Sequence, residues 1–363
     1  MNILKRVMVF VGWVSQRRNP PETFAPLAPF ATLNRGKHGA EGTRSPFPVK
    51  GRDGDGFGGG LRLWLTRPAV ILFTLCTSLA HSTPITIRDD GGHALTLAQP
   101  ARRVISLAPS LTEMLYEAGG GETLVGAVEY SDFPPQAKLI PRIGNNQKLD
   151  LERIATLKPD LVLVWFHGNA LREVERLRAL NIPMFYLEPH GIADVPAALE
   201  RLGKLVGSES TANAAAARFR ARHAAMQKTY AGRKPVRVFY QIARKPLLTI
   251  NDKQVISDVI RLCGGVNVFG KEPMLVPQLS TESVVAANPD VILTAHMGGG
   301  GESATRAMSE ASLADWLKFS NMAAVRNQQL WLIPGDAISR QGPRILNGAQ
   351  AVCSALDEAR KYP

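Results

Sequence analysis

The chain has 363 residues, of which 45% are hydrophobic and 20% are charged, as in an ordinary globular protein. This length can bury a sizeable core, in one large domain or in two lobes. The net charge is +12, but more than half of the excess lies in residues 1–80, and no basic stripe with interleaved aromatic residues follows, which argues against a nucleic-acid-binding protein.

The first 80 residues divide into two segments. Residues 1–60 are rich in Arg, Gly and Pro, and we expect them to be disordered or to be an extension that results from a misassigned start codon. Residues 61–80 carry a positive flank, an apolar run too short to span a bilayer, and small residues that end at Ala80. This pattern predicts a cleavable signal peptide and therefore export to the periplasm.

The mature chain alternates strands and helices, which predicts an α/β fold with mainly parallel sheets covered on both faces. In the first half we expect strands at 104–107, 124–128, 161–164 and 184–187, a helix from Leu111 to Ala118 capped by Ser110, and a helix at 170–180. In the second half we expect strands at 236–241, 291–295 and 330–333.

One long helix is predicted between the two halves. Residues 208–231 are rich in Ala, contain neither Pro nor Gly, and stop before Gly232 and Pro235. Such a helix is roughly 35 Å long, enough to bridge two lobes as a semi-rigid spine. An ordinary surface helix is the alternative.

Two segments repeat one pattern, once in each half. Residues 151–164 and 281–294 are both typical of a short helix with Glu in its first turn, then Pro-Asp, then a β-branched strand. Asp150 and Ser280 stand at the corresponding N-cap positions. The repeat predicts two similar α/β lobes, at 84–206 and 233–363, joined by a linking helix at 207–232.

Catalytic motifs are lacking in the sequence. There is no nucleophile elbow, phosphate-binding loop or paired Cys motif, and no nucleophile stands beside a base. His167, His190 and His296 each follow a strand, where α/β proteins bind ligands, but their spacing matches no metal signature. We therefore predict no catalytic residue and no metal site, with a metal-dependent enzyme or metal carrier as a distant alternative.

Two cysteines, Cys263 and Cys353, remain after the expected cleavage. An even pair in an exported protein usually forms a disulfide. Two separate buried thiols are the alternative.

From Arg103 to the C-terminus, the chain resembles the periplasmic binding proteins of ABC importers for vitamin B12, iron-siderophores and haem. The matching segments are Arg103–Glu113, Tyr130–Pro135, Leu151–Asp160, Trp165 with Gly168–Ala170, Cys263–Phe269, Pro277–Ser280 and Pro343–Ile345. The resemblance implies two α/β lobes joined by a long helix, a monomer, and a non-enzymatic role. The expected function is to capture cobalamin or a related corrinoid, as transported ligand rather than cofactor, and to deliver it to a permease dimer with its ATPase subunits.

The resemblance to vitamin B12 binders also implies site residues. Tyr130 and Trp165 match aromatic positions that line the ligand cleft, and Asp336 and Arg340 match polar ligand contacts. Aromatic faces suit a flat macrocycle, and a few polar groups can fix its amide-bearing rim. The two cysteines match a disulfide of the family.

Two acidic residues match the family's docking surface. Glu152 and Glu282, which are equivalent in the internal repeat, correspond to the one surface acid on each lobe that meets an Arg pocket of the transporter. The alternative is that each Glu merely stabilises its helix N-terminus.

Some positions depart from the vitamin B12 binders and keep a second ligand class open. Three positions that are aromatic in those proteins match Asn146, Leu248 and Val276 here. Haem or a ferric siderophore is therefore the alternative ligand. The residues that could serve such a ligand are Tyr130, Tyr186, His167 and His190 for iron, and Arg244 and Arg340 for a siderophore.

Overall fold

The computed structural model describes residues 84–296 and 302–362. The expected extension at 1–60 and the expected signal peptide at 61–80 lie outside these residues. Within the described ranges, no helix has the length and the apolar character needed to cross a membrane.

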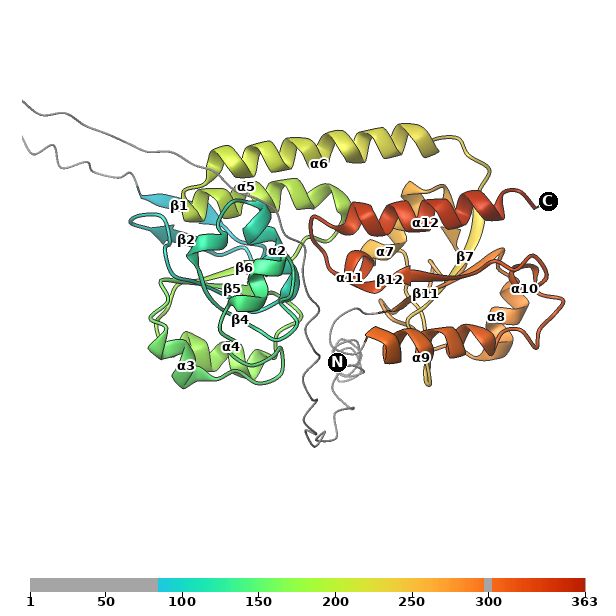
Figure 1. Cartoon of the computed structure of the whole chain (residues 1–363), viewed down its shortest axis with the longest axis horizontal. Helices are drawn as coiled ribbons and strands as arrows, with labels where there is room; N and C mark the ends of the chain where they lie inside the picture. Colours follow the sequence, from blue (N-terminus) through green and yellow to red (C-terminus); the bar gives the residue numbers. More distant parts are fainter. Residues whose placement is uncertain (1–83, 297–301, 363) are drawn as a thin grey trace, which may run out of the picture. The chain divides into compact units, whose positions relative to one another are not determined.

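Two four-stranded parallel sheets organise the chain, one in each half (Figure 1). The N-terminal sheet has the order β4 (Leu124–Ala127), β3 (Val104–Ser106), β5 (Leu161–Trp165), β6 (Met184–Leu187). The C-terminal sheet has the order β10 (Gly265–Asn267), β7 (Val236–Gln241), β11 (Val291–His296), β12 (Leu330–Pro334). The predicted α/β class with mainly parallel sheets is confirmed.

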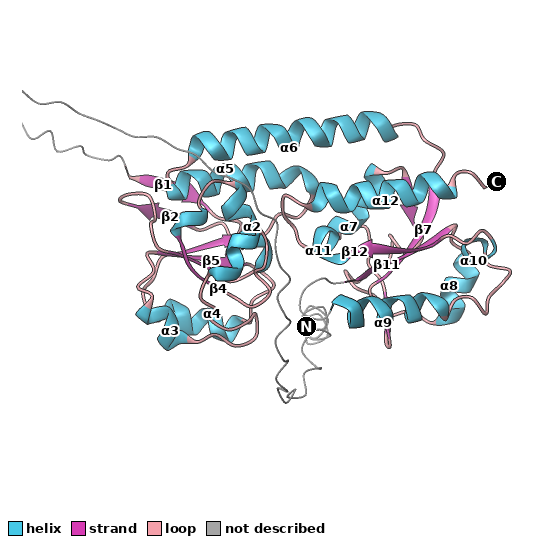
Figure 2. Cartoon of the chain, viewed as in Figure 1, coloured by secondary structure: helices cyan, strands magenta, loops and turns pink. Residues whose placement is uncertain are grey.

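Helices lie on both sides of each sheet (Figure 2). In the N-terminal half these are α2 (Pro109–Glu117), α3 (Leu151–Thr156), α4 (Leu171–Arg178) and α5 (Val195–Val206). In the C-terminal half these are α7 (Val255–Leu262), α8 (Thr281–Ala287), α9 (Glu302–Ala314), α10 (Ala323–Arg326), α11 (Gly335–Ser339) and α12 (Ile345–Ala359). Two hairpins, β1 (Ile85–Arg88) with β2 (Ala94–Leu97) and β8 (Ala243–Arg244) with β9 (Leu247–Leu248), complete the regular structure together with three short 3₁₀ turns, Gly121–Thr123, Pro135–Leu139 and Ile192–Asp194.

The strands alternate their side chains between two apolar layers. On β5, Leu161 and Leu163 pack into the same cluster as α2 and α5, while Val162 and Val164 pack with Ile154 of α3 and the apolar side chains of α4. Successive side chains of a strand point to opposite faces, so a sheet covered on both sides needs apolar residues at every position. This need explains the continuous β-branched and Leu run of the sequence.

The start of α2 differs from the prediction. Ala108, in extended conformation, is the N-cap, Pro109 occupies the first helical turn, and Ser110 lies inside the helix. The predicted Ser110 cap is wrong. Proline is favoured at the first helical position because its fixed φ suits a helix and its missing N–H has no intrahelical partner there.

The predicted repeat is present down to its hydrogen bonds. Asp150 and Ser280 cap α3 and α8 through side-chain bonds to the backbone N–H three residues on. The Asp of each Pro-Asp pair then accepts the backbone N–H that opens a neighbouring strand, Asp160 from Arg103 at 2.9 Å and Asp290 from Arg237 at 2.8 Å. The two halves are thus built from the same local unit.

The predicted long helix is α6, Glu209–Tyr230. Its buried side chains recur every three or four residues, which places them on one face: Ala212, Ala215, Ala216, Phe219, Met226 and Tyr230. The first turns lie on α5, and Arg222 donates hydrogen bonds to Asn347 and to the Leu346 carbonyl of α12 (Figure 1). The helix, about 33 Å long, therefore contacts both halves.

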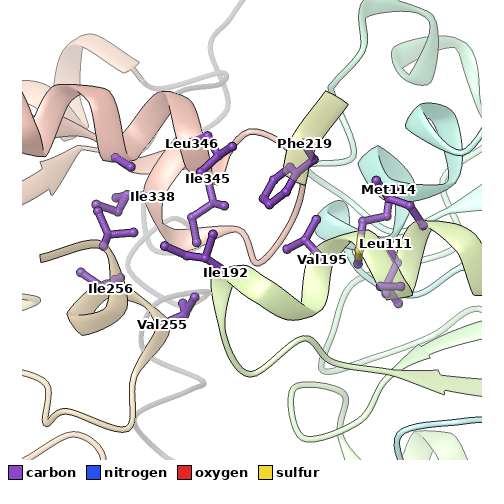
Figure 3. Packing of buried hydrophobic residues seen from close by; sticks show 14 of the residues in the cluster. Leu111, Met114, Ile192, Val195, Phe219, Val255, Ile256, Ile338, Ile345 and Leu346 are labelled. Atoms are coloured by element: carbon purple, nitrogen blue, oxygen red, sulfur yellow. The ribbon is translucent and has the colours of Figure 1, made fainter. Parts of the chain in front are cut away.

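A continuous apolar cluster also joins the halves (Figure 3). Leu111 and Met114 of α2 belong to the same buried cluster as Val195 of α5, Phe219 of α6 and Ile345 of α12. Since protein interiors are packed as densely as organic crystals, side chains in such a cluster cannot slide freely past one another. The described residues accordingly form one compact unit.

Cys263 and Cys353 form a disulfide with a Cα–Cα distance of 4.7 Å. Cys263 ends α7 and Cys353 lies within α12, so the bond joins two helices of the C-terminal half that are 90 residues apart in the sequence.

Candidate functional site

The predicted aromatic ligand residues follow the carboxyl ends of two strands in the N-terminal sheet. Tyr130 lies in the loop after β4 and Trp165 ends β5, with β3 between these strands. Tyr130 is 42% exposed and has a φ of 63°, a left-handed conformation that is uncommon for a bulky residue. Such strained residues concentrate at functional sites, and an exposed aromatic ring held this way suits ligand contact.

Trp165 is held by two hydrogen bonds and by the close approach of Gly168. Its backbone N–H donates to Asn169 Oδ1 at 2.8 Å, and its indole Nε1–H donates to Glu188 Oε1 at 3.2 Å. Asn169 in turn donates to the Leu107 carbonyl after β3 at 2.8 Å. A Cβ on Gly168 would come within 2.0 Å of the indole ring, so only glycine lets the ring lie against the turn. The Gly168-Asn169 pair of the sequence therefore orients Trp165.

Arg340, a predicted ligand contact, lies at the centre of a buried ionic network. Its Nη1 donates to Glu113 Oε1 at 2.7 Å and to Asp132 Oδ1 at 2.9 Å, while its Nη2 donates to Asp336 Oδ1 at 3.0 Å. Arg344 also binds Glu113, at 2.6 and 2.8 Å. Burial disfavours the charged guanidinium, but the attraction of Asp336, Glu113 and Asp132 outweighs it and raises the pKa of Arg340.

This network connects loops from both halves. Asp132 lies two residues after Tyr130, and Arg340 directly follows α11, which contains Asp336. The ion pair therefore brings together the two segments that carry three of the four predicted ligand residues. Arg344 adds a cation–π contact, with its guanidinium 4.1 Å from the centre of the Phe133 ring. Arg340 therefore joins the two halves through its ion pairs, in addition to its expected role as a ligand contact.

The predicted docking glutamates occupy equivalent places. Glu152 and Glu282 are both exposed, and each lies in the first turn of its helix, directly after a side-chain-capped start. No ion pair within the described ranges involves either of them. Both carboxylates are therefore presented to solvent.

His167 is paired with a buried carboxylate, Glu188, that its sequence neighbours do not indicate. His167 follows Trp165, and its Nδ1 lies 2.5 Å from Oε2 of Glu188, a carboxylate just beyond β6. Glu188 is 4% exposed, whereas the imidazole is 57% exposed. Glu188 also accepts the His167 backbone N–H at 3.1 Å. The pairing of strands β5 and β6 is the signal that could have brought these two residues together.

A hollow of about 610 Å³ lies away from these residues. Its lining comes mainly from the end of α6, the loop after it and α7, and includes His223, Tyr230, Arg233, Asp258 and Arg261. None of the four predicted ligand residues lines it. We place the candidate site at the strand ends, since ligands of open α/β sheets bind beyond the carboxyl ends of the strands.

No group of three or more His, Cys, Asp or Glu side chains in the described part of the chain is arranged to hold a metal ion. His167 and His190 follow strands of one sheet, and His296 ends a strand of the other. Among the described residues, these three histidines form no metal-holding group.

Comparison with known proteins identifies relatives over most of the described chain. The model of the periplasmic binding protein family matches residues 104–337. The vitamin B12-binding protein of Vibrio cholerae serotype O1 is 36% identical over 266 residues, covering 72% of this chain and 91% of the relative, and that of Yersinia pestis is 36% identical over 263 residues, covering 72% and 89%.

Solved structures show the same relationship. The periplasmic vitamin B12 binding protein BtuF of Vibrio cholerae has a TM-score of 0.64 and 36% identity, covering 72% of this chain and 99% of that one. The periplasmic heme-binding protein RhuT from Roseiflexus sp. RS-1, at 24% identity and a TM-score of 0.61, covers 71% of this chain and 99% of that one, and shares the fold. The chain belongs to the periplasmic binding protein family.

Proposed function

We propose that this chain is the periplasmic binding component of an ABC importer and that it captures cobalamin or a related corrinoid. The observation that carries the proposal is the 36% identity to proteins named for vitamin B12 binding, over 91% of their length. The site is compatible with this ligand. Tyr130 is exposed and Trp165 is held at the strand ends, and aromatic faces suit a flat corrin ring.

The polar partners of the ligand are proposed to be Asp336 and Arg340. Arg340 Nη2 donates to Asp336 Oδ1 at 3.0 Å, so a substitution at either residue also alters the hydrogen bonding of the other. We expect them to act together on amide groups at the rim of the corrin, where paired charges give orientation as well as affinity.

Titration calorimetry of the purified, exported protein with cyanocobalamin tests the ligand. Saturable one-to-one binding is expected. Haem is the second candidate, because Tyr130 and His167 offer side-chain groups that ligate iron. Tight haem binding without cyanocobalamin binding would identify haem, and not a corrinoid, as the ligand. A ferric siderophore titrated in the same way tests the remaining alternative.

Glu152 and Glu282 are proposed to dock the loaded protein onto the two permease subunits of the importer. Their equivalence in the repeat and their exposure support this assignment. One acid on each half matches a transporter with two like subunits, because each acid can meet a basic pocket of its own.

The docking proposal is tested with E152A/E282A and a matched control. Uptake of labelled cyanocobalamin, reconstituted with the importer, is expected to fall in the double variant while calorimetric affinity stays unchanged. Glu209 is the control, because it is an exposed Glu in the first turn of α6. If E209A lowers uptake equally, or if E152A/E282A does not lower it, the docking role is refuted.

The remaining proposals concern organisation. We propose that residues 61–80 direct export and are removed, and that the mature monomer comprises lobes at 84–206 and 233–363 joined by the helix at 207–232. Intact-mass analysis of the exported protein tests the first point, since a mature chain that begins near residue 81 is expected. Limited proteolysis tests the boundaries.

A further inference from the structure

The imidazole of His167 is oriented like that of a metal-binding histidine. Its Nδ1 faces Glu188 Oε2 at 2.5 Å, and Glu188 is almost fully buried. The Nε2 atom lies on the opposite side of the ring, and no hydrogen bond to it occurs within residues 84–296 and 302–362. Histidines that bind metals characteristically donate their other ring N–H to a carboxylate in this way.

The carboxylate fixes both the orientation and the tautomer of the ring. A proton on Nδ1, donated to Glu188, leaves the lone pair on Nε2. Glu188 is itself held by its backbone N–H, which donates to Asp90 Oδ2 at 2.7 Å, and by the Trp165 indole. The imidazole is 57% exposed, so Nε2 is accessible to an incoming ligand.

The position of His167 connects this side chain to the candidate site. His167 lies two residues after Trp165, beyond the carboxyl end of β5. Oε1 of Glu188 contacts the indole ring, and Oε2 contacts the imidazole ring. A macrocycle that contacts the indole would bring its central metal near the imidazole of the same turn. Imidazole nitrogen is a good ligand for late first-row transition metals.

We propose that His167 Nε2 coordinates the cobalt of a bound corrinoid at an exchangeable axial position, with Glu188 as the positioning residue. The inference rests on the proposed corrinoid function and adds direct recognition of the metal. Coordination replaces one axial water by one imidazole nitrogen, without a change in the oxidation state of cobalt. It predicts a preference for corrinoids whose axial position can exchange over cyanocobalamin, whose exposed axial position is taken by cyanide.

The test uses cob(II)inamide, which lacks the nucleotide base and therefore carries no nitrogen ligand of its own on the axis. Electron paramagnetic resonance of its complex with the full chain is expected to show a nitrogen triplet on the cobalt lines. The triplet should become a doublet when the protein is labelled with ¹⁵N-histidine. H167Q should abolish the splitting, while H190Q, the matched strand-end control, should retain it.

Affinity provides the second measurement. H167Q is expected to weaken aquocobalamin binding by about tenfold or more and to leave cyanocobalamin binding within about twofold. E188Q should also weaken aquocobalamin binding and reduce the nitrogen splitting. If cyanocobalamin binds but the splitting is absent, or survives in H167Q, the coordination is refuted and the proposed function stands. If none of the corrinoids binds, both are refuted.

Discussion

Replacing Arg340 with methionine should strongly destabilise the folded chain. The guanidinium makes three charge-assisted hydrogen bonds, to Glu113, Asp132 and Asp336, and its side chain is only 8% exposed. Without it, Glu113 stays buried at 2% exposure and keeps its ion pair with Arg344, while Asp132 and Asp336 lose their ion pairs with Arg340. Removing one partner of a buried ionic network costs about 3–5 kcal/mol. Because Asp132 and Asp336 are partly solvated, we expect a loss near the lower end, about 3 kcal/mol.

Urea unfolding at pH 7, followed by tryptophan fluorescence, measures this loss as a change in midpoint with little change in slope. The matched control is R218M. Arg218 is an exposed arginine of α6 that pairs with Glu117, which lies in α2 like Glu113, and its loss should cost less than about 0.5 kcal/mol. A second arm, E113L/R340M, replaces both partners by apolar groups and should cost clearly less than the sum of the two single variants. If R340M loses less than about 1 kcal/mol, or if it matches R218M, the buried network does not hold the two halves as described.

Three further predictions follow from separate features. G168A should displace the Trp165 indole and lower cyanocobalamin affinity by about tenfold in calorimetry, because an added Cβ lies 2.0 Å from the ring. Unchanged affinity would show that Trp165 does not contact the ligand. C263S/C353S should lose roughly 2–5 kcal/mol of unfolding free energy, since the bond closes a loop with a separation of 90 residues, and dithiothreitol should lower the wild type to the same level while leaving the variant unaffected. Burial lowers the pKa of His223 below its ordinary 6.5, against an opposing attraction by Asp258. The contribution of this histidine to stability is therefore complete above that pH and is lost as the pH falls. In paired urea titrations from about pH 7.5 to about pH 5.5, the wild type should lose more unfolding free energy than H223Q, and parallel curves for the two proteins would contradict this.

The local units of the fold could be predicted from the sequence. The capped helix, the Pro-Asp break and the buried strand recur in both halves because each depends on hydrogen bonds between residues close in the chain or on strand periodicity. The long helix was predicted within one residue at each end, because Ala-rich composition and the terminal Gly and Pro act locally. The Ser110 cap failed because two local signals competed, and Pro109 began the helix earlier.

The candidate site was only partly predictable. Resemblance supplied Tyr130, Trp165, Asp336 and Arg340, but nothing local indicates that Arg340 would be paired with Glu113, 227 residues away. The sequence likewise gave no indication that Glu188 would hold both the Trp165 and the His167 rings, since their contact depends on the pairing of β5 with β6.

The sequence by itself determined seven of the eight strands of the two parallel sheets, the long helix, the repeat and the class of protein, because capping, periodicity and family motifs are carried by neighbouring residues. Only the tertiary structure decided how the two halves are joined, through one shared apolar cluster and the buried charges around Arg340. The physical reason is that periodicity shows which face of an element is apolar but not which other face covers it. A buried charge, moreover, is stable only beside partners that the fold brings together from distant parts of the chain.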